Sequence, residues 1–141
     1  MIDDFKTSKA LLDKAQALAD LHGYRLDIQG AKFEPVPTET YLKESYLAND
    51  TEQQGISYNA NTKSLPIYQI DIYTPKGQGG KFSGMAIANL VKEEFKRAPM
   101  FFNDSTQTAQ ITNVSSLSVN SNDTHNLTVV SVDVLVLATS T

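Results

Sequence analysis

Apolar residues recur with a helical period in two segments of the chain. Between Asp4 and His22, hydrophobic side chains fall near i, i+3, i+4 and i+7 spacing, which predicts an amphipathic helix. Asp3 or Asp4 can cap its first turn, and Gly23 stands just beyond its end. A histidine is favourable near a helix C-terminus, so the pattern gives His22 a structural role.

A second helix is predicted from about Lys81 to Lys96. It follows a glycine-rich break in the chain, and Pro99 prevents its continuation. The residues expected on its core face are Ile87, Leu90, Val91 and Phe95, with Met85 nearby.

Elsewhere hydrophobic and polar positions alternate, which is typical of β-strands with one buried face. The alternation is clearest from Tyr68 to Tyr73 and in the valines at every second position from Val130 to Val136. Strands are predicted at residues 38–47, 56–59, 65–74, 110–119 and 127–138. Polar stretches, or stretches with proline and glycine, separate these strands at residues 29–38, 49–55, 61–64 and 120–124.

The order of these elements is a helix, about three strands, a second helix and two strands. Such segregation predicts an α+β fold, with a mainly antiparallel mixed β-sheet and two main helices packed on it. A length of 141 residues is that of one ordinary domain, so residues 1–141 are expected to form a single domain.

Composition excludes several classes of function. The chain has no cysteine, so disulfides, thiolate metal sites and cysteine nucleophiles are excluded. No apolar run approaches the roughly 20 residues of a membrane span, and the acidic N-terminus is unlike a secretory signal. We therefore expect no membrane partner and a place in the cytoplasm of the producing cell. A net charge of -4 with scattered cations argues against a surface that grips nucleic acid.

The glycine-rich segment from Gly77 to Gly84 lies between a predicted strand and a predicted helix, where a helix N-terminus can hold phosphate. The phosphate-loop pattern requires four residues between its glycines and a Ser or Thr directly after the lysine. Here Phe82 follows Lys81, so we interpret the segment as a loop that joins strand to helix, and no cofactor is expected. A small hydrolase or nucleotide-binding enzyme using this loop is the alternative from another functional class.

Histidines and carboxylates are the residue types that could act as catalytic or metal-binding groups. His22 and His125, expected at a helix end and in a polar turn, make a poor metal site, and no nucleophile-elbow motif supports a serine triad. Asp71 and Asp133 are expected mid-strand, on the face opposite the core. Paired carboxylates can do acid–base or metal chemistry, but a solvated or assembly-covered sheet face is the interpretation adopted. The sequence thus predicts no catalytic and no metal-binding residue.

Tyrosines concentrate in the predicted strands. Without a basic groove they are not expected to stack nucleic-acid bases. They are instead expected to pair across strands and at subunit interfaces. They are Tyr41, Tyr46, Tyr58, Tyr68 and Tyr73.

Several stretches together carry a family resemblance. They are Thr40-Tyr41-Leu42, the loop 49–54, Gly55-Ile56, the strand and loop 68–79, and the helix residues 86–91 with Phe95. Across about residues 5–138 they resemble the tail terminator family of long-tailed, siphovirus-type bacteriophages. In that family a Gln-Ile-Asp-Ile-Tyr type of strand runs into a Pro/Gly-rich loop, followed by a helix and two closing strands. Relative to the family, this chain adds a β-like insert at residues 56–66.

The resemblance implies a structural protein without catalysis or cofactor. Subunits of the family form a ring, commonly of six, that sits on the last ring of the major tail tube protein and stops tube polymerisation. The ring presents a surface to the head-completion protein, and DNA passes through it without specific binding. For this chain the resemblance implies a place in the virion tail after assembly in the host cytoplasm. Another head–tail connector or tail-completion protein is the alternative within the structural class.

Two loops are expected to contact other subunits or tail components, and to be mobile until assembly because they bury little apolar surface. Acidic or neutral side chains are expected to line the channel, because a basic channel would hold the DNA. The loop residues are Asn49, Asp50, Glu52 and Gln54 in the first, and Lys76, Gln78 and Lys81 in the second. The channel candidates are Asp50, Glu52, Asp71 and Asp133.

Overall fold

The computed structural model describes residues 3–48, 52–54, 61–77, 79–97, 100–103, 106–119, 122 and 124–138. Within these ranges the elements are α1 (Asp4–His22), β1 (Arg25–Asp27), β2 (Tyr41–Leu47), β3 (Glu52–Gln54), β4 (Asn61–Ser64), β5 (Ile67–Pro75), α2 (Lys81–Arg97), β6 (Met100–Asn103), β7 (Gln107–Val119) and β8 (His125–Ala138).

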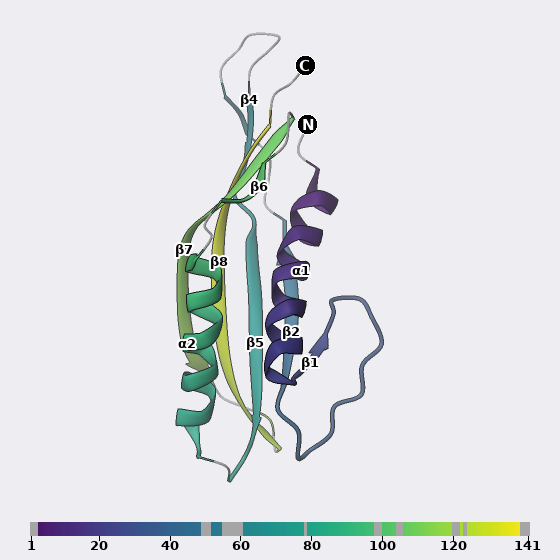
Figure 1. The fold of residues 1–141 in the computed structure, drawn as a ribbon, viewed down its shortest axis with the longest axis vertical. Helices are drawn as coiled ribbons and strands as arrows, with labels where there is room; N and C mark the ends of the chain where they lie inside the picture. Colours follow the sequence, from purple (N-terminus) through teal and green to yellow (C-terminus); the bar gives the residue numbers. More distant parts are fainter. Residues whose placement is uncertain are drawn as a thin grey trace.

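The strands join in one sheet whose longest members run the length of the molecule (Figure 1). Its order is β1-β2-β5-β8-β4-β3, while β7 pairs with the opposite side of β8 and β6 pairs with β7. Among the described strands, β1 and β2 are parallel and the other pairs are antiparallel. The predicted α+β fold with a mainly antiparallel mixed sheet is confirmed.

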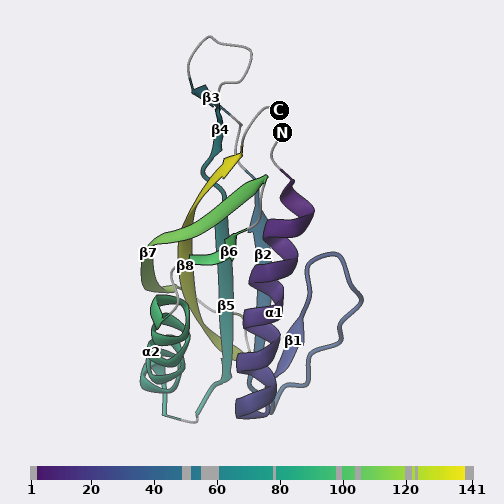
Figure 2. The same ribbon diagram turned by 45° about the horizontal axis from the view of Figure 1, so that its top comes forward.

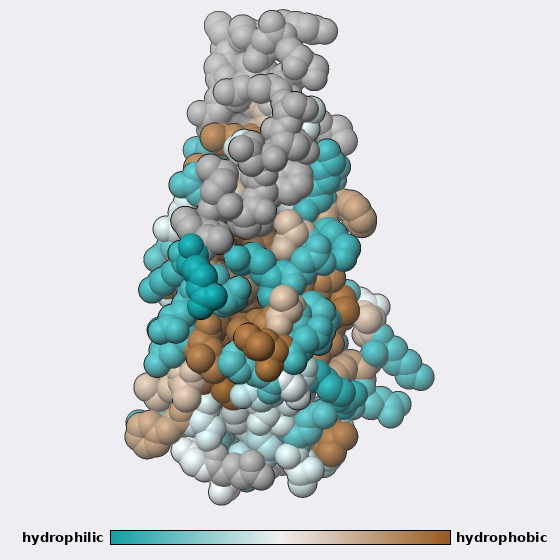
Figure 3. All heavy atoms as spheres, viewed as in Figure 1, coloured by the Kyte–Doolittle hydropathy of each residue, from teal (hydrophilic) through white to brown (hydrophobic). Residues whose placement is uncertain are grey.

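Both helices cover the same face of the sheet, α1 over β2 and α2 over β7 and β8 (Figures 1 and 2). Alternate strand residues bury their side chains beneath them, including Ile70 and Ile72 of β5 and all four valines from Val130 to Val136. Hydrophilic residues cover much of the helix-bearing face, and a hydrophobic area lies between the two helices (Figure 3). The opposite side, which we call the helix-free face, consists of the odd-numbered residues of β2, β5 and β8.

Helix α1 has the predicted ends. The Asp3 side chain accepts a hydrogen bond from the backbone N–H of Lys6, and Gly23 adopts the left-handed conformation with a φ of 75°. A glutamine far along the chain fixes its first turn, because Gln107 accepts from the Asp3 N–H at 2.7 Å and donates to the Thr7 hydroxyl at 2.8 Å. The N-terminus of α1 is thereby tied to the start of β7.

Helix α2 confirms the predicted range but corrects its core face. Leu90 is 38% exposed, so its predicted burial is wrong, and Met85, expected near the core face, is 44% exposed. The stripe that meets the sheet is narrower than expected, and these two residues lie on either side of it. The buried residues are Gly84, Ile87, Ala88, Val91 and Phe95.

The strands in the middle of the chain also differ from the prediction. Residues 52–54, predicted in a polar loop, form β3, and residues 61–64, predicted as a connection, form β4. Because β4 pairs with both β3 and the last residues of β8, tertiary pairing overrides their polar composition. The short strands β1 and β6 were not predicted, and the strand expected at 56–59 lies outside the described residues.

Candidate assembly surfaces

The two ends of the sheet present different elements. The hairpin of β3 and β4 extends from one end, next to the start of α1 and the end of β8 (Figures 1 and 2). Glu52 and Gln54, two of the predicted contact residues, therefore belong to a strand and not to a loop. Asn49 and Asp50 lie outside the described residues. The other end carries the turn from β5 to α2 and the start of β8, together with the long segment 28–40 (Figure 1).

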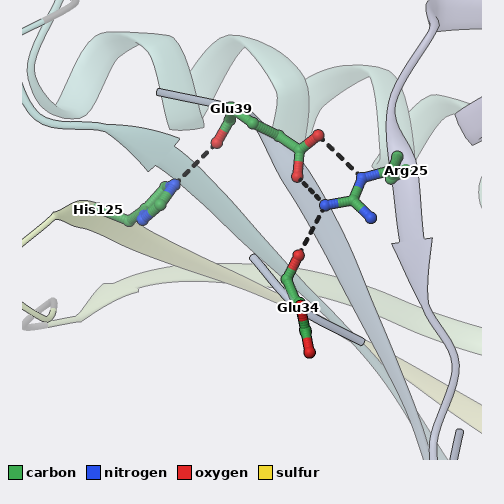
Figure 4. A network of polar contacts seen from close by, with 4 residues as sticks. All are labelled: Arg25, Glu34, Glu39 and His125. Carbon is green, nitrogen blue, oxygen red and sulfur yellow. Dashed lines mark hydrogen bonds and ion pairs between the residues drawn. The ribbon is translucent and has the colours of Figure 1, made fainter. Parts of the chain in front are cut away.

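The segment 28–40 is fixed to this second end by a polar network (Figure 4). The Arg25 guanidinium donates two hydrogen bonds to the Glu39 carboxylate, at 2.9 and 2.6 Å, and a third to the Glu34 carbonyl at 2.8 Å. The hydrogen bond from Arg25 lowers the pKa of Glu39 below its ordinary value. The Arg25 guanidinium also lies 4.4 Å from the centre of the Phe33 ring, a cation–π contact. The Arg25 side chain thus contacts three residues of the segment, namely Phe33, Glu34 and Glu39.

His125 anchors the same segment from β8. It was predicted in a polar turn, but it is the first residue of the strand and only 2% exposed, so that prediction is wrong. Its Nε2 lies 2.8 Å from the Glu39 carbonyl, and since a carbonyl can only accept, Nε2 carries the hydrogen. Its ring meets Tyr41 and Tyr73 edge-on, and these two tyrosines stack at 4.6 Å between centroids. Burial raises the pKa of both tyrosines.

The glycine-rich loop forms a turn at this end. The backbone N–H of Lys76 donates to the Thr124 carbonyl at 3.0 Å, which joins the turn after β5 to the turn before β8. Gly79 has a φ of +87°, a conformation that L side chains rarely adopt. A Cβ on Gly84 would stand 2.3 Å from the Thr128 hydroxyl, so this glycine allows α2 to approach β8. Both glycines therefore have structural reasons to be glycine.

The predicted contact residues of this loop that the structure describes, Lys76 and Lys81, are exposed. Gln78 lies outside the described residues.

The helix-free face holds the two predicted channel residues. Asp71 on β5 is 9% exposed and accepts a hydrogen bond from Gln69 at 2.8 Å. Asp133 on β8 is half-buried and lies 3.5 Å from the side-chain amide of Asn113. The sheet therefore brings both carboxylates to one face, as the alternation predicted. Neutral side chains cross the middle of this face in register, namely Ser45, Gln69, Ser131 and Ser115.

A buried carboxylate contributes to the hydrogen bonding along the outer side of residues 44–47 of β2, which we call the β2 side. Glu44 is 3% exposed and accepts hydrogen bonds from the Tyr68 hydroxyl and from the backbone N–H of Gln29, both at 2.9 Å. The Gln29 side chain in turn accepts from the backbone N–H of Tyr46 at 2.7 Å. Burial, with the Glu44 carboxylate beside it, raises the pKa of Tyr68 far above its ordinary value. Sequence reasoning missed Glu44, although its place between Leu42 and Tyr46 on the core-facing parity of β2 was a usable signal.

No group of three or more His, Asp or Glu residues that could hold a metal ion occurs within the described part of the chain. In the same ranges, no helix is both long enough and apolar enough to cross a membrane.

Comparison with known proteins places this arrangement among structural subunits of phage tails. Residues 6–134 match the family model described as phage tail terminator protein. The chain belongs to the phage tail terminator family, which is a family of structural proteins and not of enzymes.

A solved structure with a TM-score of 0.74 and 14% identity covers 96% of this chain and 96% of its own, which shows a shared fold. No curated protein matches the chain.

Proposed function

We propose that the chain assembles into a six-membered ring that caps the tail tube, ends its polymerisation and provides the surface that joins the head. Membership of the tail terminator family carries this proposal. The shape of the subunit supports it, since the strands of one continuous sheet run between two ends that carry different elements (Figure 1). A ring that joins the tube on one side and the head on the other requires subunits whose two ends along the ring axis differ. Identical subunits that pair head to tail close into a ring when the rotation between them allows it.

The partners in this proposal are further copies of the chain, the major tail tube protein and a head-completion protein. The whole chain, residues 1–141, acts as one terminator-like domain in the virion tail after assembly in the host cytoplasm. Contacts with the partners involve the two ends of the sheet, where the β3–β4 hairpin and the loop with Lys76 and Lys81 lie.

In this proposal the helix-free face lines the channel. Its central row is neutral, and its charged side chains are Lys43 and Asp71, which lie opposite each other in register, and Asp133. Six copies at -4 each give the ring a charge of -24. DNA would not be held by such a wall, because tight binding requires cations that replace the counterions of the phosphates.

Electron microscopy of purified protein mixed with tail tubes tests the capping role. We expect a ring at one end of each tube and no elongation when tube protein is added. Tubes that continue to grow, or protein that binds along their sides, would refute the proposal.

The channel assignment has its own test. Asp133→Lys should leave rings intact and slow DNA ejection, while Asp20→Lys, an identical charge change on the exposed face of α1, should not. Equal ejection rates for both variants would refute the channel assignment and leave the capping role standing.

A further inference from the structure

The two long sides of the sheet differ in whether their peptide groups are paired, and the difference points to an interface. In β7, residues 108–110 lie between β8 and β6, but residues 113–119 pair only with β8 among the described strands. We call the outer side of residues 113–119 the β7 edge. Ser115 to Val119 are all exposed, and Leu117 is 65% exposed. Helix α2 packs on the helix-bearing face of β7 (Figure 1).

Hydrogen-bond alternation identifies the outward-facing peptide groups. The Val134 N–H donates to the Pro66 carbonyl, so the even-numbered residues of β8 face β4 and β5 and the odd-numbered ones face β7. The odd-numbered residues of β7 from 113 to 119 are in register with odd-numbered residues of β8. The peptide groups of Val114, Ser116 and Ser118 therefore point away from the sheet.

Natural edge strands are normally protected by charged side chains, proline, bulges or covering segments, because unpaired peptide groups are a template for another strand. The one irregularity in the pairing of β7 with β8 lies between Ile111 and Asn113, before the edge begins. Residues 113–119 contain neither proline nor charge and are rich in serine and valine. The edge has the properties of a strand-addition site, in which backbone hydrogen bonds supply the contact.

We propose that the β7 edge is occupied in the ring by a backbone segment of a second copy of this chain, so that the subunits join through continuous sheet pairing. This inference rests on the ring proposed above. The ring places a second copy at each lateral side of a subunit, and the charge distribution permits that copy to approach at this edge. Each copy carries a charge of -4, so identical copies repel one another over most of their surface, whereas residues 105–122 contain no charged side chain. Pairing here also covers Leu117 and Val119 at no electrostatic cost.

Amide hydrogen exchange at single-residue resolution provides the direct test. In the free chain, the Val114, Ser116 and Ser118 amides should exchange rapidly and those of Ser115 and Leu117 slowly. On assembly the first group should become protected about tenfold or more, because each of these amides then donates a hydrogen bond to the neighbouring strand. Unchanged exchange of Ser116 and Ser118 in assembled rings would overturn the proposal.

Two variants test the edge by assembly. Ser116→Pro removes an outward N–H, and Ser118→Lys places a charge beside it, so each should raise the concentration for half-assembly by about tenfold or more. Ala17→Lys, on the exposed face of α1, is the charge-matched control and should assemble like wild type. Normal assembly of both edge variants, with unchanged thermal unfolding, would overturn the proposal.

Cross-linking identifies the occupant. Because the chain has no cysteine, Ser118→Cys carries one unique attachment point for a cysteine-to-lysine reagent. We expect a bond between two copies of this chain, and a bond only to the tube protein would overturn the proposal. Absence of any ring on tubes would refute the proposed function instead. The edge inference would then be decided by whether the Ser116 and Ser118 amides gain protection as the chain is concentrated.

Discussion

The β2 side and the β7 edge both carry peptide groups that point away from the sheet, but among the described residues only the β2 side binds these groups within the subunit. On β2, the outward N–H of Tyr46 donates to the Gln29 side chain, and the Gln29 N–H donates to buried Glu44. On β7, the corresponding N–H groups of Ser116 and Ser118 have no strand partner among the described residues. A side that is satisfied within the subunit contributes to folding, whereas an unsatisfied side is available for a neighbour.

Replacing Glu44 with Ala should have the largest effect on stability, because it removes the buried acceptor of two hydrogen bonds at the β2 side. Each of the two donors left without an acceptor, the Tyr68 hydroxyl and the Gln29 N–H, costs about 1–3 kcal/mol of unfolding free energy. Urea denaturation measures the loss. Glu44→Gln keeps one acceptor oxygen and should lose less, so equal losses for the two variants would contradict the role given to the carboxylate.

Paired proline substitutions on β7 sharpen the comparison. Ser115→Pro should remove a hydrogen bond to β8 and cost about 1–3 kcal/mol, because the Ser131 carbonyl loses its donor. Ser116→Pro should cost less than about 1 kcal/mol, because its N–H points outward. Thermal unfolding of both variants measures the two losses of stability. A larger loss for Ser116→Pro than for Ser115→Pro would show that the outward and inward peptide groups are assigned wrongly.

Alkaline unfolding tests the buried pair behind the β2 side. The folded pKa of Tyr68 is raised above its unfolded value of about 10, so its contribution is complete below pH 10 and is lost as pH rises beyond that value. Wild type should then lose stability more steeply than Tyr68→Phe, by up to about 1.4 kcal/mol per pH unit. Urea midpoints between pH 9 and 11 provide the measurement, and parallel curves would count against a protonated, buried Tyr68.

Gln29→Ala should remove the acceptor of the Tyr46 N–H at the β2 side. The loss of unfolding free energy should be smaller, about 0.5–1.5 kcal/mol, because water can hydrate this N–H. Exchange of the Tyr46 amide should accelerate while that of Ser116 stays as fast as before. Gln16→Ala, which removes another glutamine hydrogen bond at the surface of α1, serves as the control and should leave the Tyr46 amide unchanged.

Glu39→Gln should have the smallest effect, since exposed ion pairs contribute little to stability. The folded pKa of Glu39 is lowered, so its contribution is present above the unfolded pKa and is lost as pH falls through the folded one. Between pH 5 and 3, wild type should lose slightly more stability than Glu39→Gln. A variant that is more acid-sensitive than wild type would contradict the pairing with Arg25.

Several features could be predicted from sequence because neighbouring residues decide them. The caps of α1, the stop after α2 and the inward valines of β8 depend on local hydrogen bonding and on periodicity. The same parity placed Asp71 and Asp133 together on the helix-free face. Whether they line a channel stays a prediction, because no property of a single subunit tests it.

Only the tertiary structure decided the features whose partners lie far apart in sequence. Polar β4 becomes a strand because the end of β8 offers it hydrogen bonds, and His125 is buried because Glu39, 86 residues away, accepts from its ring. The two sides of the sheet are the clearest case. Residues 113–119 and residues 41–47 both read locally as strands, and composition does not say which side remains unpaired. Which side remains unpaired depends on the positions of Gln29 beside β2 and of β6 beside β7, and non-local pairing determines both positions.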